Sequence, residues 1–267
     1  MYHAIHADDD ISAVDAEDLP YAVSVSEFTR QLDQLATLDV GLCDEQSMPD
    51  VIITFDDGHG SNLHLAAPLL VERKLPAYFF VTTDFIDKRA HFMSSEELGQ
   101  LSRMPGMCIG SHGTSHRFFD DLTPEESLRE LNDSRTFLEQ VCGCACRSMS
   151  FPGGRFTPGV LSQLKSAGYT QWFGSELGLI SDARFLQTKA SETSESERWF
   201  LATQREARPL ERVAIRRSTQ IDEFRSIICQ ESGYFRRKQM SSRVKRLLRQ
   251  IIGNRLYHGL YKSIAER

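Results

Sequence analysis

From about Val51 onward, short apolar runs alternate with stretches of helical periodicity, and this alternation limits the fold more than any other feature. Strands that alternate with helices predict a parallel sheet or barrel, because each helix returns the chain to the start of the next strand. The runs that predict strands are Val51–Phe55, Ala77–Val81, Met107–Gly110, Ser148–Phe151 and Val213–Ile215.

The predicted helices have recognisable ends. Ser94 and Glu97 have the spacing of a capping box, and Thr123 and Glu126 repeat it. The polar stretch Ala190–Arg198 is predicted to be a mobile loop or insertion. The predicted helices are Ser26–Thr37, Asn62–Arg73, one that begins after Ser94, one from Thr123 to about Val141, and one from Thr157 to Gly168.

A chain of 267 residues that is 40% apolar can bury one large core or two smaller ones. No stretch approaches the roughly 20 apolar residues that span a bilayer. The first ten residues have neither a basic region nor an apolar core, so we expect no secretory signal and a cytoplasmic protein. The six cysteines fit a reducing compartment and are predicted to be free thiols. The alternative is a soft-metal site at Cys142, Cys144 and Cys146, which alternate with small residues.

Charge is distributed unevenly along the chain. Residues 231–267 hold ten Lys and Arg against two Glu, a net charge of +8. Because the whole chain has a net charge of −6, residues 1–230 carry −14. No basic stripe runs through residues 1–230, so nucleic acid is not expected as a partner. We expect a barrel domain over residues 1–230 and a basic helical extension over 231–267. The extension either packs on the barrel or makes a peripheral contact with an anionic membrane surface.

Residues suited to metal chemistry follow two of the predicted strands. Asp56 and Asp57 end the first apolar run, and His112 and His116 follow Met107–Gly110. Functional groups gather beyond the carboxyl ends of parallel strands, so we expect these side chains to lie together. One carboxylate and two imidazoles leave a metal position open for water, and the other carboxylate is then free to act as a base. The pattern predicts metal-assisted hydrolysis, although each motif alone also fits a helix cap or a core histidine.

Three motifs carry a family resemblance, namely Thr54–Gly58, Ser111–His116 and Phe151–Gly154. They resemble the motifs of the polysaccharide deacetylases, the NodB-homology group also known as carbohydrate esterase family 4. The resemblance runs from about Tyr2 to Tyr169 and implies an α/β fold, a distorted (β/α)7-type barrel with fewer strands than a TIM barrel. It also implies hydrolytic removal of an acyl group, usually acetyl, from the nitrogen of an amino sugar.

The same resemblance implies roles for the residues at the strand ends. By position, Asp57, His112 and His116 would hold a divalent metal. Asp56 would act as the general base. The mixed nitrogen and oxygen ligand set favours Zn²⁺, with Co²⁺, Ni²⁺ or Mn²⁺ as alternatives.

The glycine turn of the third motif is expected to hold the substrate and its oxyanion. The residues implied are Gly153, Gly154 and Arg155, since a missing side chain allows close approach to a backbone N–H. The family usually has an arginine two residues before the proline, which steadies the catalytic aspartate. This chain has Ser150 there, so either Arg155 or Arg147 replaces that arginine, or neither does.

The fourth and fifth motifs of the family, an Asp-Trp pair and a Leu-x-His, are not recognisable, and the fifth normally supplies the general acid. His59, two residues beyond Asp57, is the first candidate to replace it, and His3 is the second. Arg212 or Arg216, near the last predicted strand, would bind a substrate anion.

The resemblance points to relatives that act in surface-polysaccharide biosynthesis. The expected substrate is therefore a nucleotide-linked or lipid-linked amino sugar. Two other interpretations stay open, because the last two motifs are missing. One is a catalytically impaired sugar-binding protein that retains the metal site, and the other is a hydrolase of a different non-peptide C–N bond.

Overall fold

The computed structural model describes residues 1–42, 49–180 and 209–240. Its contacts divide the chain into two compact units, Met1–Arg225 and Ser226–Arg267. The expected boundary between residues 230 and 231 stays a prediction. The predicted loop Ala190–Arg198 and residues 241–267 of the basic extension lie outside the described residues.

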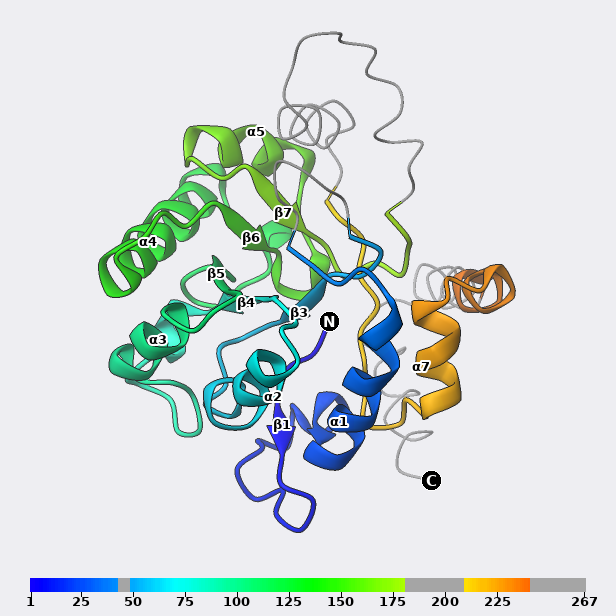
Figure 1. The fold of residues 1–267 in the computed structure, drawn as a ribbon. Coiled ribbons are helices and arrows are strands. Elements are labelled where there is room, and N and C mark those ends of the chain that lie inside the picture. The colour runs from blue at the N-terminus through cyan, green and yellow to red at the C-terminus, as the bar shows by residue number, and fades with distance from the viewer. Residues whose placement is uncertain (43–48, 181–208, 241–267) are drawn as a thin grey trace, which may run out of the picture. The chain divides into compact units, whose positions relative to one another are not determined.

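A five-stranded parallel sheet organises the first unit (Figure 1). Its strand order follows the chain, and neighbouring strands pair in register, as Phe55 with Phe79 and Val81 with Ser111 show. The alternation in the sequence is thus confirmed as a parallel α/β architecture. The strands are β3 (Ile53–Phe55), β4 (Ala77–Val81), β5 (Met107–Ser111), β6 (Ser148–Ser150) and β7 (Gln171–Phe173).

Short backbone pairings extend this sheet at both edges. Tyr2 bridges to Phe55 in β3, and Leu210 bridges to Phe173 in β7. The two extensions also meet, because the Ile215 N–H donates to the Met1 carbonyl over 2.9 Å. The sheet therefore curls into a ring, as the predicted distorted barrel requires.

The prediction of a regular strand over Val213–Ile215 is wrong. The segment is extended, but its backbone hydrogen bonds to the adjacent N-terminal segment all go to one residue, Met1. One residue cannot support a ladder of strand bonds, so the segment stays irregular. A separate parallel pair, β1 (Ile5–His6) with β2 (Val23–Ser24), was not predicted.

Helices α3, α4 and α5 lie outside the curled sheet (Figure 1). Both predicted capping boxes form, at Ser94 with Glu97 and at Thr123 with Glu126, and α4 ends at Gly143 in the left-handed conformation. The helices are α1 (Val25–Gln34), α2 (Ala67–Glu72), preceded by a π-helical turn (Asn62–Ala66), α3 (Ser95–Ser102), α4 (Pro124–Cys142), α5 (Pro158–Ser166) and α7 (Ile221–Ile228). Short 3₁₀ turns occupy Leu19–Tyr21, Leu35–Thr37, Thr83–Phe85, Phe119–Asp121 and Pro152–Gly154. No helix in the described part of the chain combines the length and apolar character needed to cross a bilayer.

The pleat of β3 determines what faces the interior of the ring. Phe55 packs outward against Phe28 of α1, with ring centroids 5.9 Å apart, and stacks on Phe79 at 4.8 Å. Side chains two residues apart in a strand share a face, so Thr54 and Asp56 point to the opposite side, into the ring. There an apolar cluster lines the space below them, formed by Tyr78, Phe80, Phe173 and Leu210.

Candidate metal centre

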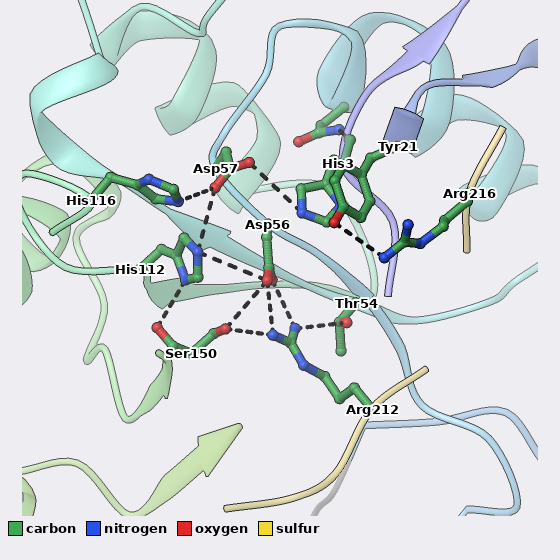
Figure 2. Close-up of polar contacts among 11 residues, drawn as sticks. His3, Tyr21, Thr54, Asp56, Asp57, His112, His116, Ser150, Arg212 and Arg216 are labelled. Atoms are coloured by element: carbon green, nitrogen blue, oxygen red, sulfur yellow. Dashed lines mark hydrogen bonds and ion pairs between the residues drawn. The ribbon is translucent and has the colours of Figure 1, made fainter. Parts of the chain in front are cut away.

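The predicted metal ligands meet at the carboxyl ends of β3 and β5 (Figure 2). Asp57 directly follows Asp56 at the end of β3, and His112 follows β5. Asp57 and His116 both have left-handed backbones, with φ of 76° and 62°. Asp and His adopt this conformation more readily than most residues, and here it turns both side chains toward His112.

The three side chains are close enough to share one ion. Asp57 Oδ1 lies 3.1 Å from His116 Nε2 and 3.4 Å from His112 Nε2. Their ligand atoms all lie within 4.8 Å of one another. Within the described ranges, one other group meets the same distance limit, the acidic cluster of Asp15, Glu17 and Asp18. Arg89 forms ion pairs with two of these acids, Asp15 at 3.0 Å and Glu17.

Two observations fit a metal at the first group. Asp57 Oδ1 is buried and has no hydrogen-bond partner among the residues that the structure describes. His112 Nδ1 lies 2.8 Å from the Ser150 carbonyl, which only accepts hydrogen bonds, so Nδ1 carries the proton. The lone pair of His112 is therefore on Nε2, which faces Asp57. This is how ligating histidines are commonly oriented.

The electrostatics keep His112 and Asp57 in the states that bind metal. Burial lowers the pKa of His112 to about 4, so its imidazole is neutral near pH 7. Burial alone would raise the pKa of Asp57, but the nearby imidazoles of His116, His3 and His112 hold it well below its usual range. Burial also lowers the pKa of His116, and the adjoining Asp57 more than offsets this, so its pKa rises. An anionic oxygen and two imidazoles thus converge on one point.

Asp56, the predicted base, is bound by Arg212, for which the sequence had predicted a different role. Both of its carboxylate oxygens accept hydrogen bonds from Arg212, each over 2.8 Å. Burial raises the pKa of Asp56, but the positive charge of Arg212 more than offsets this and holds the pKa below the ordinary value. The expectation that Arg212 binds a substrate anion is therefore wrong, because Asp56 already occupies its guanidinium.

The two candidate proton donors differ in their surroundings. His3 Nε2 lies 3.9 Å from Asp57 Oδ2, and its ring packs against Tyr21, with centroids 4.7 Å apart and planes tilted by 36°. Asn62 donates a hydrogen bond to the His3 carbonyl over 2.8 Å. Both ring nitrogens of His59, in contrast, already have partners, the Ser61 hydroxyl at 2.7 Å and the Ala13 carbonyl at 2.9 Å. The role of His59 stays a prediction, and the geometry favours His3.

The glycine turn forms as expected, but its residues are not equally free to bind the substrate or its oxyanion. Gly153 has a left-handed backbone, with φ of 59°, whereas the Gly154 N–H already donates to the Phe151 carbonyl over 2.8 Å. Arg155 forms ion pairs with Asp120 and Asp121, at 2.9 and 3.0 Å. Arg155 therefore does not replace the arginine missing at position 150, and Gly153 remains the candidate oxyanion donor.

Glu130 of α4 holds the loop between the two histidines. Its carboxylate accepts hydrogen bonds from the Thr114 N–H at 2.6 Å, the Ser115 N–H at 2.9 Å and the Ser115 hydroxyl at 2.5 Å. These bonds fix the backbone that carries His116. The sequence placed Glu130 in a segment that resembles the family but gave it no role, although its place two turns into a predicted helix could have suggested an inward-facing carboxylate.

Comparison with known proteins confirms the family resemblance for the central part of the chain. Residues 44–172, just under half of the sequence, match the polysaccharide deacetylase family. A curated relative is YxkH of Bacillus subtilis (strain 168), named as a candidate polysaccharide deacetylase, which is 28% identical over 131 residues. That alignment covers 49% of this chain and 46% of YxkH, so the similarity spans about half the length of the relative.

Solved deacetylase structures share the fold at low sequence identity. The Streptococcus pyogenes deacetylase PplD, solved with acetate, has a TM-score of 0.67 and 19% identity, covering 85% of this chain and 96% of PplD. A polysaccharide deacetylase from Bacillus cereus has a TM-score of 0.64 and 21% identity, covering 85% and 67%. A de-N-acetylase from Aggregatibacter actinomycetemcomitans has a TM-score of 0.64 and 16% identity, covering 84% and 97%. This likeness confirms the predicted barrel.

Proposed function

We propose that this chain, whose residues 44–172 match the polysaccharide deacetylases, is a metal-dependent hydrolase that removes the N-acetyl group from an amino sugar. The observation that carries the proposal is the convergence of Asp57, His112 and His116 beside a second, separately held carboxylate, Asp56. A structural ion site needs no such carboxylate, whereas hydrolysis needs a base next to the ion.

A divalent ion, for which we propose Zn²⁺, would be held by Asp57, His112 and His116. When bound, it would lower the pKa of water and polarise the substrate carbonyl. The buried Asp57 oxygen without a hydrogen-bond partner and the proton-free His112 Nε2 support this ligand set. Two imidazoles and a carboxylate also suit Co²⁺, Ni²⁺ and Mn²⁺, so the metal found in the cell depends on supply as well as on affinity.

The chain's own groups can complete the reaction. Asp56 accepts a proton as water attacks the amide carbonyl, and the Gly153 N–H donates to the oxygen that becomes negative. The C–N bond then breaks, and His3 donates a proton to the leaving amine nitrogen. The products are acetate and the free amino sugar. His3 suits this role because its ring packs against the Tyr21 ring and lies beside Asp57.

For the substrate, we propose a nucleotide-linked or lipid-linked amino sugar made for a surface polysaccharide, in the cytoplasm or at the inner face of the membrane. An N-acetylated amino sugar is supported by the fold that this chain shares with a de-N-acetylase. The basic C-terminal extension, with its net charge of +8, supports contact with an anionic surface.

Acetate release tests the proposed activity. Zinc-loaded protein is incubated with UDP-N-acetylglucosamine and, separately, with tri-N-acetylchitotriose, and acetate and free amine are both quantified. We expect the two products in equal amounts from at least one probe, and their loss after EDTA treatment. Tight zinc binding without acetate from either probe would contradict the proposal and favour the sugar-binding alternative. Release of another acid, such as formate from a formamide, would favour the hydrolase of a different C–N bond.

Replacement of His3 tests the proton donor. We expect His3→Gln to lower kcat by about 100-fold or more, since general acids contribute roughly 10²–10⁴ in rate. Its zinc affinity should match the wild type, because His3 is not among the three ligands. His64→Gln is the matched control, since His64 pairs with Glu97 at 2.6 Å, outside the site. A normal kcat in His3→Gln would transfer the role back to His59.

A further inference from the structure

Arg212 is unusually well satisfied for a buried arginine. The side chain is only 6% exposed. A guanidinium has five N–H donors, and every one of them has a partner here. The partners are the Gly174 carbonyl at 2.6 Å, the Thr54 hydroxyl at 3.1 Å, both Asp56 oxygens at 2.8 Å and the Ser150 hydroxyl at 2.6 Å. No donor remains to bind a substrate.

The partners come from several different parts of the ring. Thr54 belongs to β3, Ser150 to β6, and Gly174 directly follows β7. Arg212 itself lies in the extended segment that begins at Leu210 and pairs with β7. Its guanidinium therefore ties three strands and the closing segment to one carboxylate. Figure 2 shows the contacts with Thr54, Ser150 and Asp56. Rotation of Asp56 would break two bonds at once.

We propose that Arg212 is a positioning residue, which holds the Asp56 carboxylate in the orientation needed to accept a proton and thereby replaces the arginine missing at position 150. Ser150 supports this inference, since its hydroxyl lies 2.6 Å from Arg212 and 3.4 Å from Asp56 Oδ2. Positions 150 and 212 thus reach the same point from two different segments, β6 and the segment that pairs with β7. The inference rests on the proposed function, because it assigns Asp56 the role of base.

Fixed geometry is distinct from simple charge balance. A lysine at position 212 would keep the positive charge, but it is a point charge and cannot form two parallel bonds to one carboxylate. If Arg212 only balanced the charge of Asp56, lysine would serve as well. If it aims the carboxylate, lysine fails, because a displacement of about 1 Å can cost on the order of 100-fold in rate.

The first experiment compares Arg212→Lys with the wild type on whichever probe releases acetate. We expect kcat to fall by about 100-fold. KM and zinc affinity should stay near the wild-type values, since all five donors of Arg212 are already bound to protein atoms. Arg135→Lys is the matched control, because Arg135 also binds a carboxylate, that of Glu139, and a carbonyl, that of Ala167. A wild-type kcat in Arg212→Lys would overturn the proposal.

The second experiment moves the guanidinium from position 212 to position 150. Arg212→Ala should lose activity, and the double variant Arg212→Ala/Ser150→Arg should recover at least 10-fold of it. Guanidinium chloride at millimolar concentration should also partly rescue Arg212→Ala, but not Arg212→Lys, whose side chain fills the space. Failure of both rescues in folded protein would contradict a positioning role.

A crystal structure of zinc-loaded Arg212→Lys provides a test that does not depend on activity. We expect Asp56 to rotate away from its wild-type orientation while Asp57, His112 and His116 stay in place. An unchanged Asp56 would refute the inference, even if no probe releases acetate. If the wild type is inactive on both probes but Asp56 does rotate, the proposed function fails and the positioning role of Arg212 stands.

Discussion

At the scale of single residues, Asp57 combines two unusual properties. It is a buried carboxylate with low pKa, and its backbone is left-handed, a conformation that costs most L-residues roughly 1–2 kcal/mol. The chain accepts this backbone where the side chain must turn toward two histidines. An outlier of this kind at a cluster of ligands is typical of a functional site.

Asp57→Asn should distinguish the role of Asp57 as a metal ligand from its contribution to the stability of the fold. Asn tolerates the left-handed backbone as well as Asp does, so we expect the free energy of unfolding of the metal-free protein to change little. Loss of the anionic oxygen should lower zinc affinity by more than about 100-fold, since outer partners of metal ligands alone account for about 10–100-fold. Isothermal titration calorimetry measures the affinity, and chemical denaturation measures the stability.

Asp87→Asn is the control for this prediction. Asp87 also has a left-handed backbone, with φ of 61°, but it binds Ser95 at the start of α3 instead of a histidine. Its zinc affinity should equal that of the wild type. Equal losses of affinity in both variants would show that Asp57 acts through the backbone and is not a ligand.

At the scale of elements, the site depends on how α4 is placed against the end of β5. The Thr123 capping box begins α4, and Glu130, about two turns further on, reaches the loop after β5. One carboxylate thus orders two of the three N–H groups between His112 and His116. The helix contributes no metal ligand, but it fixes the distance between two of them.

We expect Glu130→Ala to weaken zinc binding by about 10-fold, because the loop that carries His116 loses its anchor. Stability should fall by about 2 kcal/mol, since three hydrogen bonds to a charged group are removed. Asp133→Ala, an exposed position on the same helix, controls for the loss of an acidic residue from α4. Unchanged zinc affinity in a folded Glu130→Ala protein would mean that His116 holds its position without the helix.

At the scale of the whole molecule, a metal ion would join segments that are far apart in the sequence. The three ligands follow β3 and β5, so an ion that binds only the folded state must stabilise the sheet that positions them. The gain is about 2.7 kcal/mol when free metal is 100 times the dissociation constant.

Zinc should therefore raise the melting temperature of the intact protein, and EDTA should reverse the change. For a domain of this size, about 2.7 kcal/mol corresponds to a shift of roughly 5–10 °C. Differential scanning calorimetry measures it, with Asp57→Asn as the variant that should show no shift. A shift of the same size in that variant would place the stabilising ion elsewhere in the molecule.

The sequence by itself determined the parts of this protein that depend on short-range patterns. Alternation of strands and helices predicted the parallel ring, and two capping boxes marked the starts of α3 and α4. Three motifs predicted which side chains meet at the strand ends. Such features are legible because each is encoded within a few residues, where periodicity and backbone preference act directly.

Only the tertiary structure decided what surrounds those side chains. Arg212 reaches Asp56 across 156 positions in the sequence, and His3, from the first residues of the chain, reaches Asp57 at the end of β3. Neither contact leaves a local pattern, because closure of the ring brings together the first residues and the segment after Leu210. The late strand was mispredicted for the same reason: its partner is a single residue at the other end of the first unit, and no periodicity could reveal it.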